Sequence, residues 1–177
     1  MAEGIRGADQ EVRDPKAVAI AEECGRQSES ALYTSTALFI WLREARWTNR
    51  FFIVTPVILG AASGITFFQS PQNAGWASVL AIIAGLFPAV RDALRLDIHL
   101  DQIKTLAAEY KMLQDGFRQV EKIYAPSSSK DAEARMRLLM DQLERARSHS
   151  MTIPERVFKA AQKKIDSGDY DFTVDIR

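Results

Sequence analysis

The stretch that decides the fold is Phe51–Val90, FFIVTPVILGAASGITFFQSPQNAGWASVLAIIAGLFPAV. It contains no Asp, Glu, Lys or Arg, and it is bounded by Arg50 and Arg91. Its two apolar halves are joined by the polar, turn-forming segment QSPQNAG. A helix that spans a bilayer needs about 20 mainly apolar residues, and each charge in the hydrocarbon costs several kcal/mol. The stretch therefore predicts a transmembrane hairpin over residues 51–90, with spans at 51–69 and 74–90.

The second half of the hairpin is the shorter one. From Trp76 to Val90 it is about 22 Å long at about 1.5 Å per residue, so it must use residues 73–75 and the snorkelling of Arg91 and Arg95 to cross. Two alternatives stay open, a hairpin buried in a soluble helical bundle and a re-entrant hairpin that stops short of the far side. The transmembrane hairpin is favoured over the soluble one, because a soluble helix of this length normally has a polar face. The re-entrant alternative rests on the marginal length of the second half.

Composition limits the classes of partner. The 177 residues carry 23 Lys and Arg and 23 Asp and Glu, and this balance argues against a nucleic-acid binder held by phosphate contacts. A single cysteine, Cys24, excludes an intrachain disulfide. The N-terminal segment MAEGIRGADQEVRDP has no apolar core, so we expect no cleavable signal peptide and a disordered segment over residues 1–13.

Basic residues flank the hairpin, whereas its connecting loop has none. The positive-inside tendency therefore predicts a multi-pass protein with both termini in the cytoplasm. Tryptophans stand where an interfacial aromatic belt would lie. The predicted membrane-interface residues are Trp41, Arg43, Arg46, Trp47, Arg50, Trp76, Arg91 and Arg95.

Residues 14–50 are predicted to form cytoplasmic or interfacial helices. Asp14 before Pro15 is a capping residue before a proline at the first helical position. Gly25 is expected to end or weaken this helix, and a second helix is expected from about Ser28. Its apolar patch ALFIWL and the following arginines would lie at the membrane surface and face anionic lipid, or the patch would pack on later helices.

The chain after the hairpin predicts one long cytoplasmic helix over residues 91–124. Apolar residues recur on it at a/d heptad spacing, and such a seam needs a partner surface, from the same chain or from another subunit. The seam consists of Leu96, Ile103, Leu106, Tyr110, Leu113, Phe117, Val120 and Tyr124.

Residues 127–177 predict a C-terminal helical region. The segment APSSSK breaks the long helix, and an amphipathic helix follows from about Lys130 to Ser148. Thr152 and Glu155 have capping-box spacing for one more helix, which ends at Ser167 and Gly168. The fold expected from these elements is an all-α membrane protein.

Motifs for enzymatic chemistry are absent from the sequence. There is no glycine-rich phosphate loop, no metal-ligand spacing and no nucleophile motif. His99 and His149 fall on separate predicted helices, and Cys24 is expected to be a small buried side chain. We therefore expect no enzyme activity, no cofactor and no catalytic or metal-binding residue.

Two faces are expected on the hairpin helices. Small residues at four-residue spacing allow close helix packing, and these are Gly60, Gly64, Ala77, Ala81 and Gly85. Polar residues share another arc of the first span and would line water in a ring of subunits, and these are Thr55, Ser63, Thr66, Gln69 and Ser70. Alternatively, the hydroxyls bond back to the preceding turn, which costs little in lipid. Without an intramembrane charge, no ion selectivity is implied.

Three segments resemble a known family. FIWLREARWTNRFF, PVILGAASG and LAAEYKMLQDGF are similar to parts of SLATT domains, the two-span effector domains of bacterial conflict systems. The resemblance covers residues 31–124 and brings no catalytic residue. It implies a bacterial inner-membrane protein that forms pores, works beside a partner that generates or senses a nucleotide signal, and kills or arrests an infected cell.

Two functions follow as hypotheses. The first is an oligomeric antiphage effector that permeabilises the bacterial inner membrane when its partner signals. The second is a membrane-anchored scaffold, in which the hairpin only tethers cytoplasmic helices that dock a partner protein. The expected partners are thus the lipid bilayer, further copies of this chain and a nucleotide-generating or nucleotide-sensing protein, with no nucleic acid.

Overall fold

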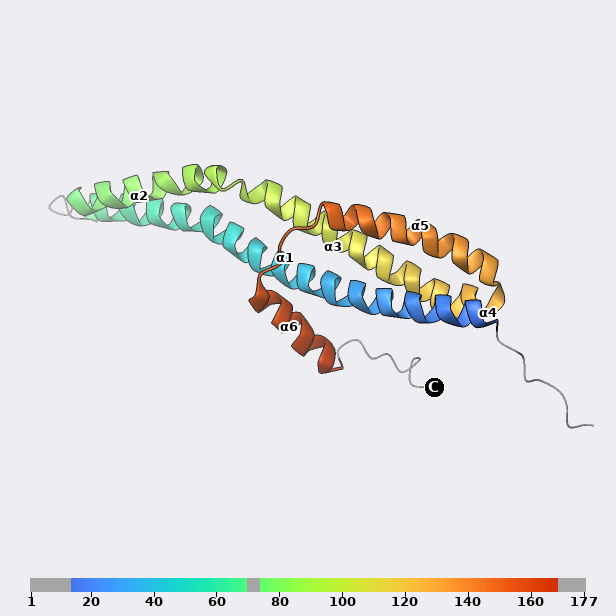
Figure 1. Ribbon diagram of the computed structural model, residues 1–177. Coiled ribbons are helices and arrows are strands. Elements are labelled where there is room, and N and C mark those ends of the chain that lie inside the picture. The colour runs from blue at the N-terminus through green and yellow to red at the C-terminus, as the bar shows by residue number, and fades with distance from the viewer. Residues whose placement is uncertain (1–13, 70–73, 169–177) are drawn as a thin grey trace, which may run out of the picture. The chain divides into compact units, whose positions relative to one another are not determined.

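The computed structural model describes the backbone of residues 14–69 and 74–168, and the side chains of 14–65 and 75–168. These residues form helices and no strand, so the predicted all-helical fold is confirmed (Figure 1). The chain divides into two compact units, Met1–Ser35 with Ala108–Ser150 and Thr36–Ala107 with Met151–Arg177. The predicted disorder of residues 1–13 lies outside the described residues.

The first helix, α1, is a single helix over Pro15–Gln69. It begins as predicted, because the Asp14 carboxylate accepts a hydrogen bond from the backbone N–H of Lys16 at 3.0 Å. The predicted helix end at Gly25 is wrong. A glycine inside a helix costs about 1 kcal/mol, and the helix continues through it all the same. A Cβ on Gly25 would lie 3.4 Å from Cδ of Glu121.

The second helix, α2, spans Ala74–Ala93, and α3 spans Leu96–Gln119. The prediction of one continuous helix from the hairpin to residue 124 is therefore wrong at Leu94 and Arg95. Arg95 adopts a positive φ of 48°, which turns the chain between the two helices. This conformation costs a non-glycine residue about 1 kcal/mol or more, so contacts on either side of the turn must hold it.

After α3 the chain continues through a π-helical turn, η2, at Val120–Tyr124 and a short helix, α4, at Ala125–Ser127. The break comes at Ser128, which is extended at φ −159° and lies in the predicted segment APSSSK. The Ser128 hydroxyl accepts a hydrogen bond from the N–H of Asp131 at 3.3 Å. It thereby caps α5 at Ser129–Ser148, within one residue of the predicted start.

The last described helix, α6, spans Glu155–Asp166. The predicted capping box of Thr152 and Glu155 is wrong, because Pro154 is the N-cap and no side chain caps the helix. Pro154 instead fixes the start through its carbonyl, which accepts from the N–H of Val157 at 2.9 Å. The predicted end is confirmed, with Gly168 at a positive φ of 83°.

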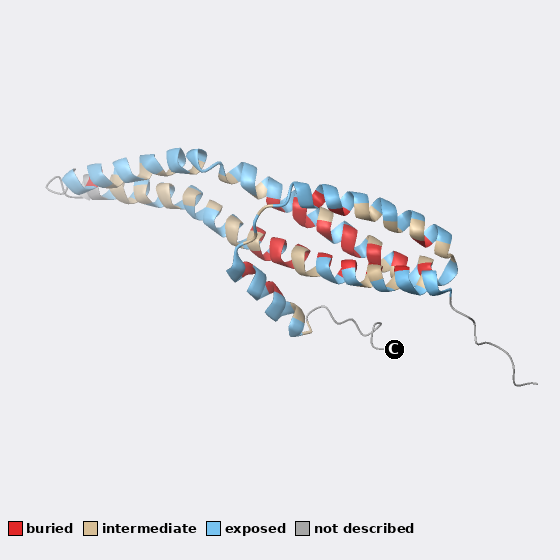
Figure 2. Ribbon diagram, viewed as in Figure 1, coloured by how far each residue is buried: buried red, intermediate tan, exposed pale blue. Residues whose placement is uncertain are grey.

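The unit that contains the N-terminal part of α1 has its core where α1, α3 and α5 face one another (Figure 2). The Ser28 hydroxyl donates to the carbonyl of Gln114 at 3.2 Å and joins α1 to α3. Gly116 brings α3 close to α5, because a Cβ there would lie 2.8 Å from Cδ2 of Leu139. The largest buried side chains of this core include Cys24, Phe117 and Val120.

The other unit contains the hairpin and α6. Val157 and Ala161 on one face of α6 pack with Ala37 and Ile40 of α1, and Trp41 and Ile153 lie against this cluster. Spacing of three and four residues puts each pair on one helical face. One side of the helix that precedes the hairpin therefore does pack on a later helix, as one of the two sequence alternatives proposed.

Candidate functional site

The candidate site is the hairpin formed by residues 51–69 of α1 and by α2. Figure 1 shows α2 lying alongside this end of α1. The covered stripe of α2 recurs at three- and four-residue spacing, and it comprises Ala77, Leu80, Ala84, Phe87 and Arg91. At the end near Arg91, the ring of Phe87 lies 5.7 Å from that of Phe52 and 6.0 Å from that of Phe51, measured between centroids. The two helices thus meet along one narrow aromatic and small-residue seam.

The predicted polar face of α1 lies partly within this seam. The Ser63 hydroxyl donates a hydrogen bond of 2.7 Å to the carbonyl of Ala77 on α2, and Thr55 is half-buried. Thr66 and Gln69 belong to α1, but their side chains lie outside the described residues, as does Ser70 altogether. In the single chain, Ser63 therefore joins the two hairpin helices.

The predicted small-residue face lies elsewhere. A Cβ built on Gly60, Gly64 or Gly85 meets no atom within 4 Å, and Ala81 is exposed. Of this set, Ala77 alone is buried, at 4% exposure. The glycines therefore do not form the contact between α1 and α2. Their role in packing between copies of the chain stays a prediction.

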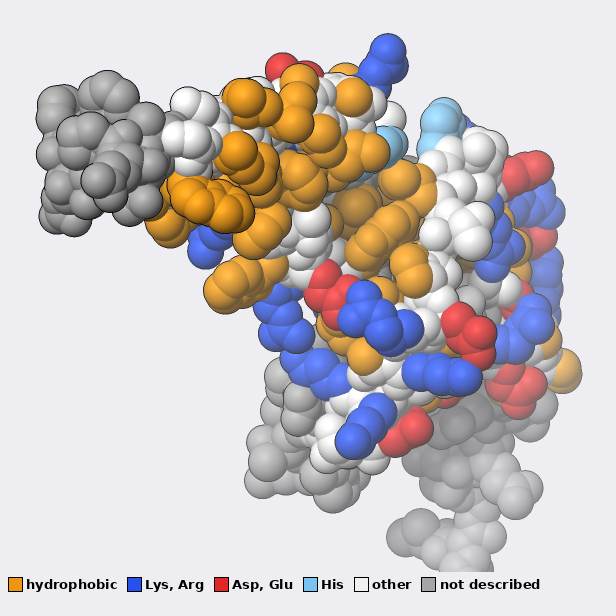
Figure 3. Space-filling view, turned by 90° about the vertical axis from the view of Figure 1, so that its left-hand side faces the viewer, with side chains coloured by type: hydrophobic (Ala, Val, Ile, Leu, Met, Phe, Trp, Pro, Cys, Tyr) orange, Lys and Arg blue, Asp and Glu red, His pale blue; other side chains and the backbone are white. Residues whose placement is uncertain are grey.

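The outer surface of the hairpin is apolar and uncovered. Both α1 and α2 are long and apolar enough to cross a membrane, and 6% of the most apolar window of each is buried. Figure 3 shows hydrophobic side chains gathered over this part of the chain. The large exposed side chains of the run include Val54, Val57, Ile58, Ile65, Val79, Ile82, Ile83 and Leu86. A soluble core helix of this length would bury such side chains.

Three polar side chains, here called the polar base, join the helices where the charge-free run ends. Arg91 Nε donates to Oδ1 of Asn49 at 2.9 Å, and Arg91 Nη2 donates to Oδ1 of Asp97 at 2.6 Å. Asp97 lies in the first turn of α3, where the helix dipole favours a carboxylate. The polar base therefore links α1, α2 and α3 on either side of the turn at Arg95.

Sequence reasoning missed Asn49 and Asp97. Of the three residues in the polar base, the sequence predicts a role for Arg91 alone, as a basic residue that snorkels. The available signal was an acidic residue six positions after Arg91, beyond the last apolar residue of the hairpin. Because a helix of unbroken period was expected, this spacing did not indicate a contact. The turn at Leu94 and Arg95 is what brings Asp97 back to Arg91.

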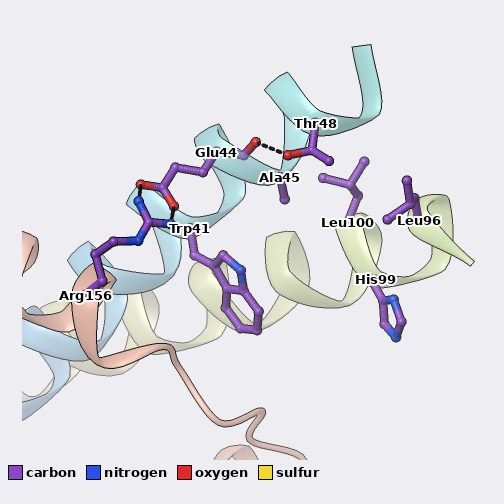
Figure 4. A pocket seen from close by; sticks show the side chains of 8 residues that line it. All are labelled: Trp41, Glu44, Ala45, Thr48, Leu96, His99, Leu100 and Arg156. Atoms are coloured by element: carbon purple, nitrogen blue, oxygen red, sulfur yellow. Dashed lines mark hydrogen bonds and ion pairs between the residues drawn. The ribbon is translucent and has the colours of Figure 1, made fainter. Parts of the chain in front are cut away.

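A shallow pocket of about 240 Å³ lies beside Trp41 in the same unit. The Arg156 guanidinium on α6 forms two hydrogen bonds to the Glu44 carboxylate on α1, of 3.1 and 2.8 Å, at its edge (Figure 4). Leu96, His99 and Leu100 of α3 complete the wall. The side chain of His99 is exposed. Arg156 and Glu44 neutralise each other, so the pocket has little free charge with which to bind a charged ligand.

Other reactive groups are dispersed. Within residues 14–69 and 74–168, no three His, Cys, Asp or Glu side chains gather in a way that could hold a metal ion. Cys24 is fully buried, and burial, helped by the carboxylates of Glu23 and Glu121, raises its thiol pKa to about 11. A thiol with this pKa is a poor nucleophile at neutral pH.

The predicted heptad seam is mostly covered by the chain's own fold. Its members Ile103, Leu106, Tyr110, Leu113, Phe117 and Val120 are buried, and Leu96 and Tyr124 are half-buried. Tyr124 also receives the Arg135 guanidinium 4.0 Å from its ring centroid. The seam therefore has an intrachain partner surface over its central part.

Searches against protein-family models, curated proteins and solved structures found no match to this chain. The resemblance of residues 31–124 to SLATT domains thus stays a prediction from sequence.

Proposed function

We propose that the hairpin of α1 and α2 inserts into a membrane and that the protein acts there as an oligomeric effector that permeabilises the bilayer. The observation that carries the proposal is the charge-free run from Phe51 to Val90, in which most of the large apolar side chains that the structure describes are exposed. Burial in hydrocarbon is the arrangement that removes this much apolar surface from water without a further protein layer.

The effector role is supported by the outer faces of the hairpin. Gly60, Gly64 and Gly85 leave open space above the helix backbone, and small residues of this kind let transmembrane helices of separate subunits approach closely. Such packing would assemble a ring of hairpins. In the antiphage role that the SLATT resemblance implies, a nucleotide-generating or nucleotide-sensing partner triggers this assembly in the bacterial inner membrane, with both termini of the chain in the cytoplasm.

A membrane-anchored scaffold is the second candidate, and one contact favours it. The Ser63 hydroxyl is satisfied by the Ala77 carbonyl, so this member of the polar set points into the hairpin. In a conducting ring of these hairpins, either the hydrogen bond from Ser63 to Ala77 would have to break or other groups would have to face the water. An anchor needs neither change.

Membrane insertion is tested first and by itself. The full chain, expressed in bacteria, is expected to sediment with membranes and to resist extraction by alkaline carbonate. Release into the supernatant would exclude the proposed insertion and both functions built on it.

Permeabilisation is then tested in cells with a dye that reports membrane potential. Induced expression with the activating partner system is expected to depolarise the membrane, and Thr55→Leu with Thr66→Leu is expected to reduce this effect if these hydroxyls line water. The matched control is Val54→Leu with Ile65→Leu, which changes two exposed apolar residues of the same helix. An inserted protein that never depolarises the membrane would support the scaffold instead.

A further inference from the structure

The segment of α1 that enters the hairpin carries one exposed face of arginines and tryptophan. Arg43, Arg46, Trp47 and Arg50 follow one another at spacings of three, one and three residues, so they share one side of the helix. All four side chains are exposed, and Trp47 is 72% exposed. This basic face, defined by these four residues, ends where the charge-free run begins.

The three guanidinium groups of the basic face have no partner within the described part of the chain, whereas the guanidinium of Arg91 at the end of the hairpin does. Arg91 is held by Asp97 and Asn49 in the polar base. Glu44 is the one carboxylate in the sequence from Leu42 to Arg50, and Arg156 of α6 already occupies it. Arg91 on α2 is thus neutralised by Asp97, whereas the three arginines of the basic face on α1 are not neutralised.

One to two turns earlier, the same helix is covered by protein. Ala37 and Ile40 pack with α6, and Trp41 lies against this cluster. The predicted interfacial tryptophans therefore differ, since Trp41 is half-buried against α6 while Trp47 projects from the basic face. The four side chains of the basic face are thus exposed just beyond the part of α1 that α6 covers.

The chemistry of the basic face fits one kind of partner. Guanidinium groups bind phosphate oxygens through paired N–H donors, and indole rings favour the level of lipid headgroups. Given that the hairpin inserts as proposed above, the three guanidinium groups and the indole ring of Trp47 lie where the helix leaves the hydrocarbon. We propose that Arg43, Arg46, Trp47 and Arg50 form a binding face for the phosphate headgroups of anionic phospholipids.

The test uses the full chain with Trp47 as the single tryptophan, made by Trp41→Phe and Trp76→Phe. It is reconstituted in phosphatidylcholine vesicles that contain a minor fraction of a brominated lipid, which quenches nearby tryptophan. In one sample the brominated lipid is phosphatidylglycerol, and in the other it is phosphatidylcholine, with bromine high on the acyl chain in both. Quenching of Trp47 is expected to reveal a preference for the anionic lipid of roughly fivefold at low salt. High salt is expected to reduce it by screening.

Three variants separate headgroup binding from a structural effect. Arg43→Gln, Arg46→Gln and Arg50→Gln together are expected to abolish the preference, whereas the corresponding Lys substitutions retain the charge and keep most of it. Arg135→Gln, Arg137→Gln and Arg145→Gln, three exposed positions on α5, are expected to leave it unchanged. A protein whose single tryptophan is Trp76 is expected to show equal quenching by both lipids.

Insertion is measured on the same samples by resistance to alkaline carbonate. An inserted protein in which Trp47 is quenched equally by both lipids overturns the lipid-binding face and leaves the proposed membrane function intact. A loss of preference in the α5 control as large as in the basic-face variant also overturns it. A protein that fails to insert overturns both proposals.

Discussion

The thiol of Cys24 is buried on α1, and its pKa is raised to about 11 by burial and by the carboxylates of Glu23 and Glu121. At pH 8 this pKa lowers the thiolate fraction about 100-fold below that of an ordinary thiol. We predict correspondingly slow alkylation of the folded protein, and rapid alkylation after unfolding in urea. Iodoacetamide labelling followed by mass spectrometry measures both rates.

The control for this prediction moves the thiol to the surface of the same helix. Cys24→Ser with Ser30→Cys places it at an exposed position, where labelling of the folded protein is expected to be fast. Fast labelling of the unaltered folded chain would contradict the burial of Cys24.

The polar base gives a second prediction at the scale of single residues. Asp97→Ala removes the carboxylate that pairs with Arg91, and the Asp97 side chain is 61% exposed. Solvent screening limits the expected loss of unfolding free energy to about 1 kcal/mol or less. The larger expected effect is local, because the turn at Leu94 and Arg95 loses a contact that holds its positive φ. Hydrogen exchange in detergent should show faster exchange of the amides at residues 94–97.

Asp115→Ala is the matched control for that measurement. Asp115 forms an exposed ion pair with Lys111 inside α3, so its removal leaves the turn untouched. Unchanged exchange at residues 94–97 in the Asp97 variant would show that the polar base does not hold the turn.

At the scale of elements, α6 depends on its apolar face. Val157 is 1% exposed and packs with Ala37 and Ile40 of α1. Val157→Asp would bury a carboxylate without a partner, which costs several kcal/mol, so we predict that α6 detaches. Limited proteolysis should then cleave near residues 150–154 at least several times faster. Lys163→Asp places the same carboxylate on the exposed side of α6 and is expected to leave cleavage unchanged.

The continuous helix α1 illustrates how tertiary packing overrides local sequence signals. Gly25 and Pro56 both lie inside it, and each disfavours a helix by itself. The burial of Cys24 and Ser28, on either side of Gly25, favours continuation instead. None of these long-range contacts can be read from the spacing of residues in the sequence.

For the whole molecule, membrane insertion and a soluble fold predict opposite effects of charge on the hairpin. Ile58 and Ile82 are 61% and 66% exposed. In water, lysines there would be harmless. In a bilayer, each lysine near the centre of a span costs about 2.5–3.5 kcal/mol. We predict that Ile58→Lys with Ile82→Lys releases the protein from membranes or lowers its level sharply, as measured by sedimentation and immunoblotting.

Met112 and Leu138 provide the control for the lysine pair. They are 65% and 63% exposed on α3 and α5, outside the charge-free run. Met112→Lys with Leu138→Lys is expected to leave sedimentation unchanged. Equal behaviour of the two lysine pairs would argue against a bilayer around the hairpin.

The sequence by itself determined the all-helical fold, the position of the charge-free hairpin, and the approximate bounds of α2, α5 and α6. These features follow from composition and from periods of three to four residues, which act locally along the chain. Gly168 likewise ended α6 as predicted, because a glycine accepts a positive φ readily.

Tertiary structure decided which side of each helix meets which neighbour. It continued α1 through Gly25, turned the chain at Arg95 so that Asp97 reaches Arg91, and directed Ser63 toward α2 while leaving Gly60 uncovered. These outcomes depend on contacts between residues far apart in sequence and on one costly backbone conformation that such contacts hold in place. Helical periodicity shows which residues share a face, but the partner of that face is set by packing in three dimensions.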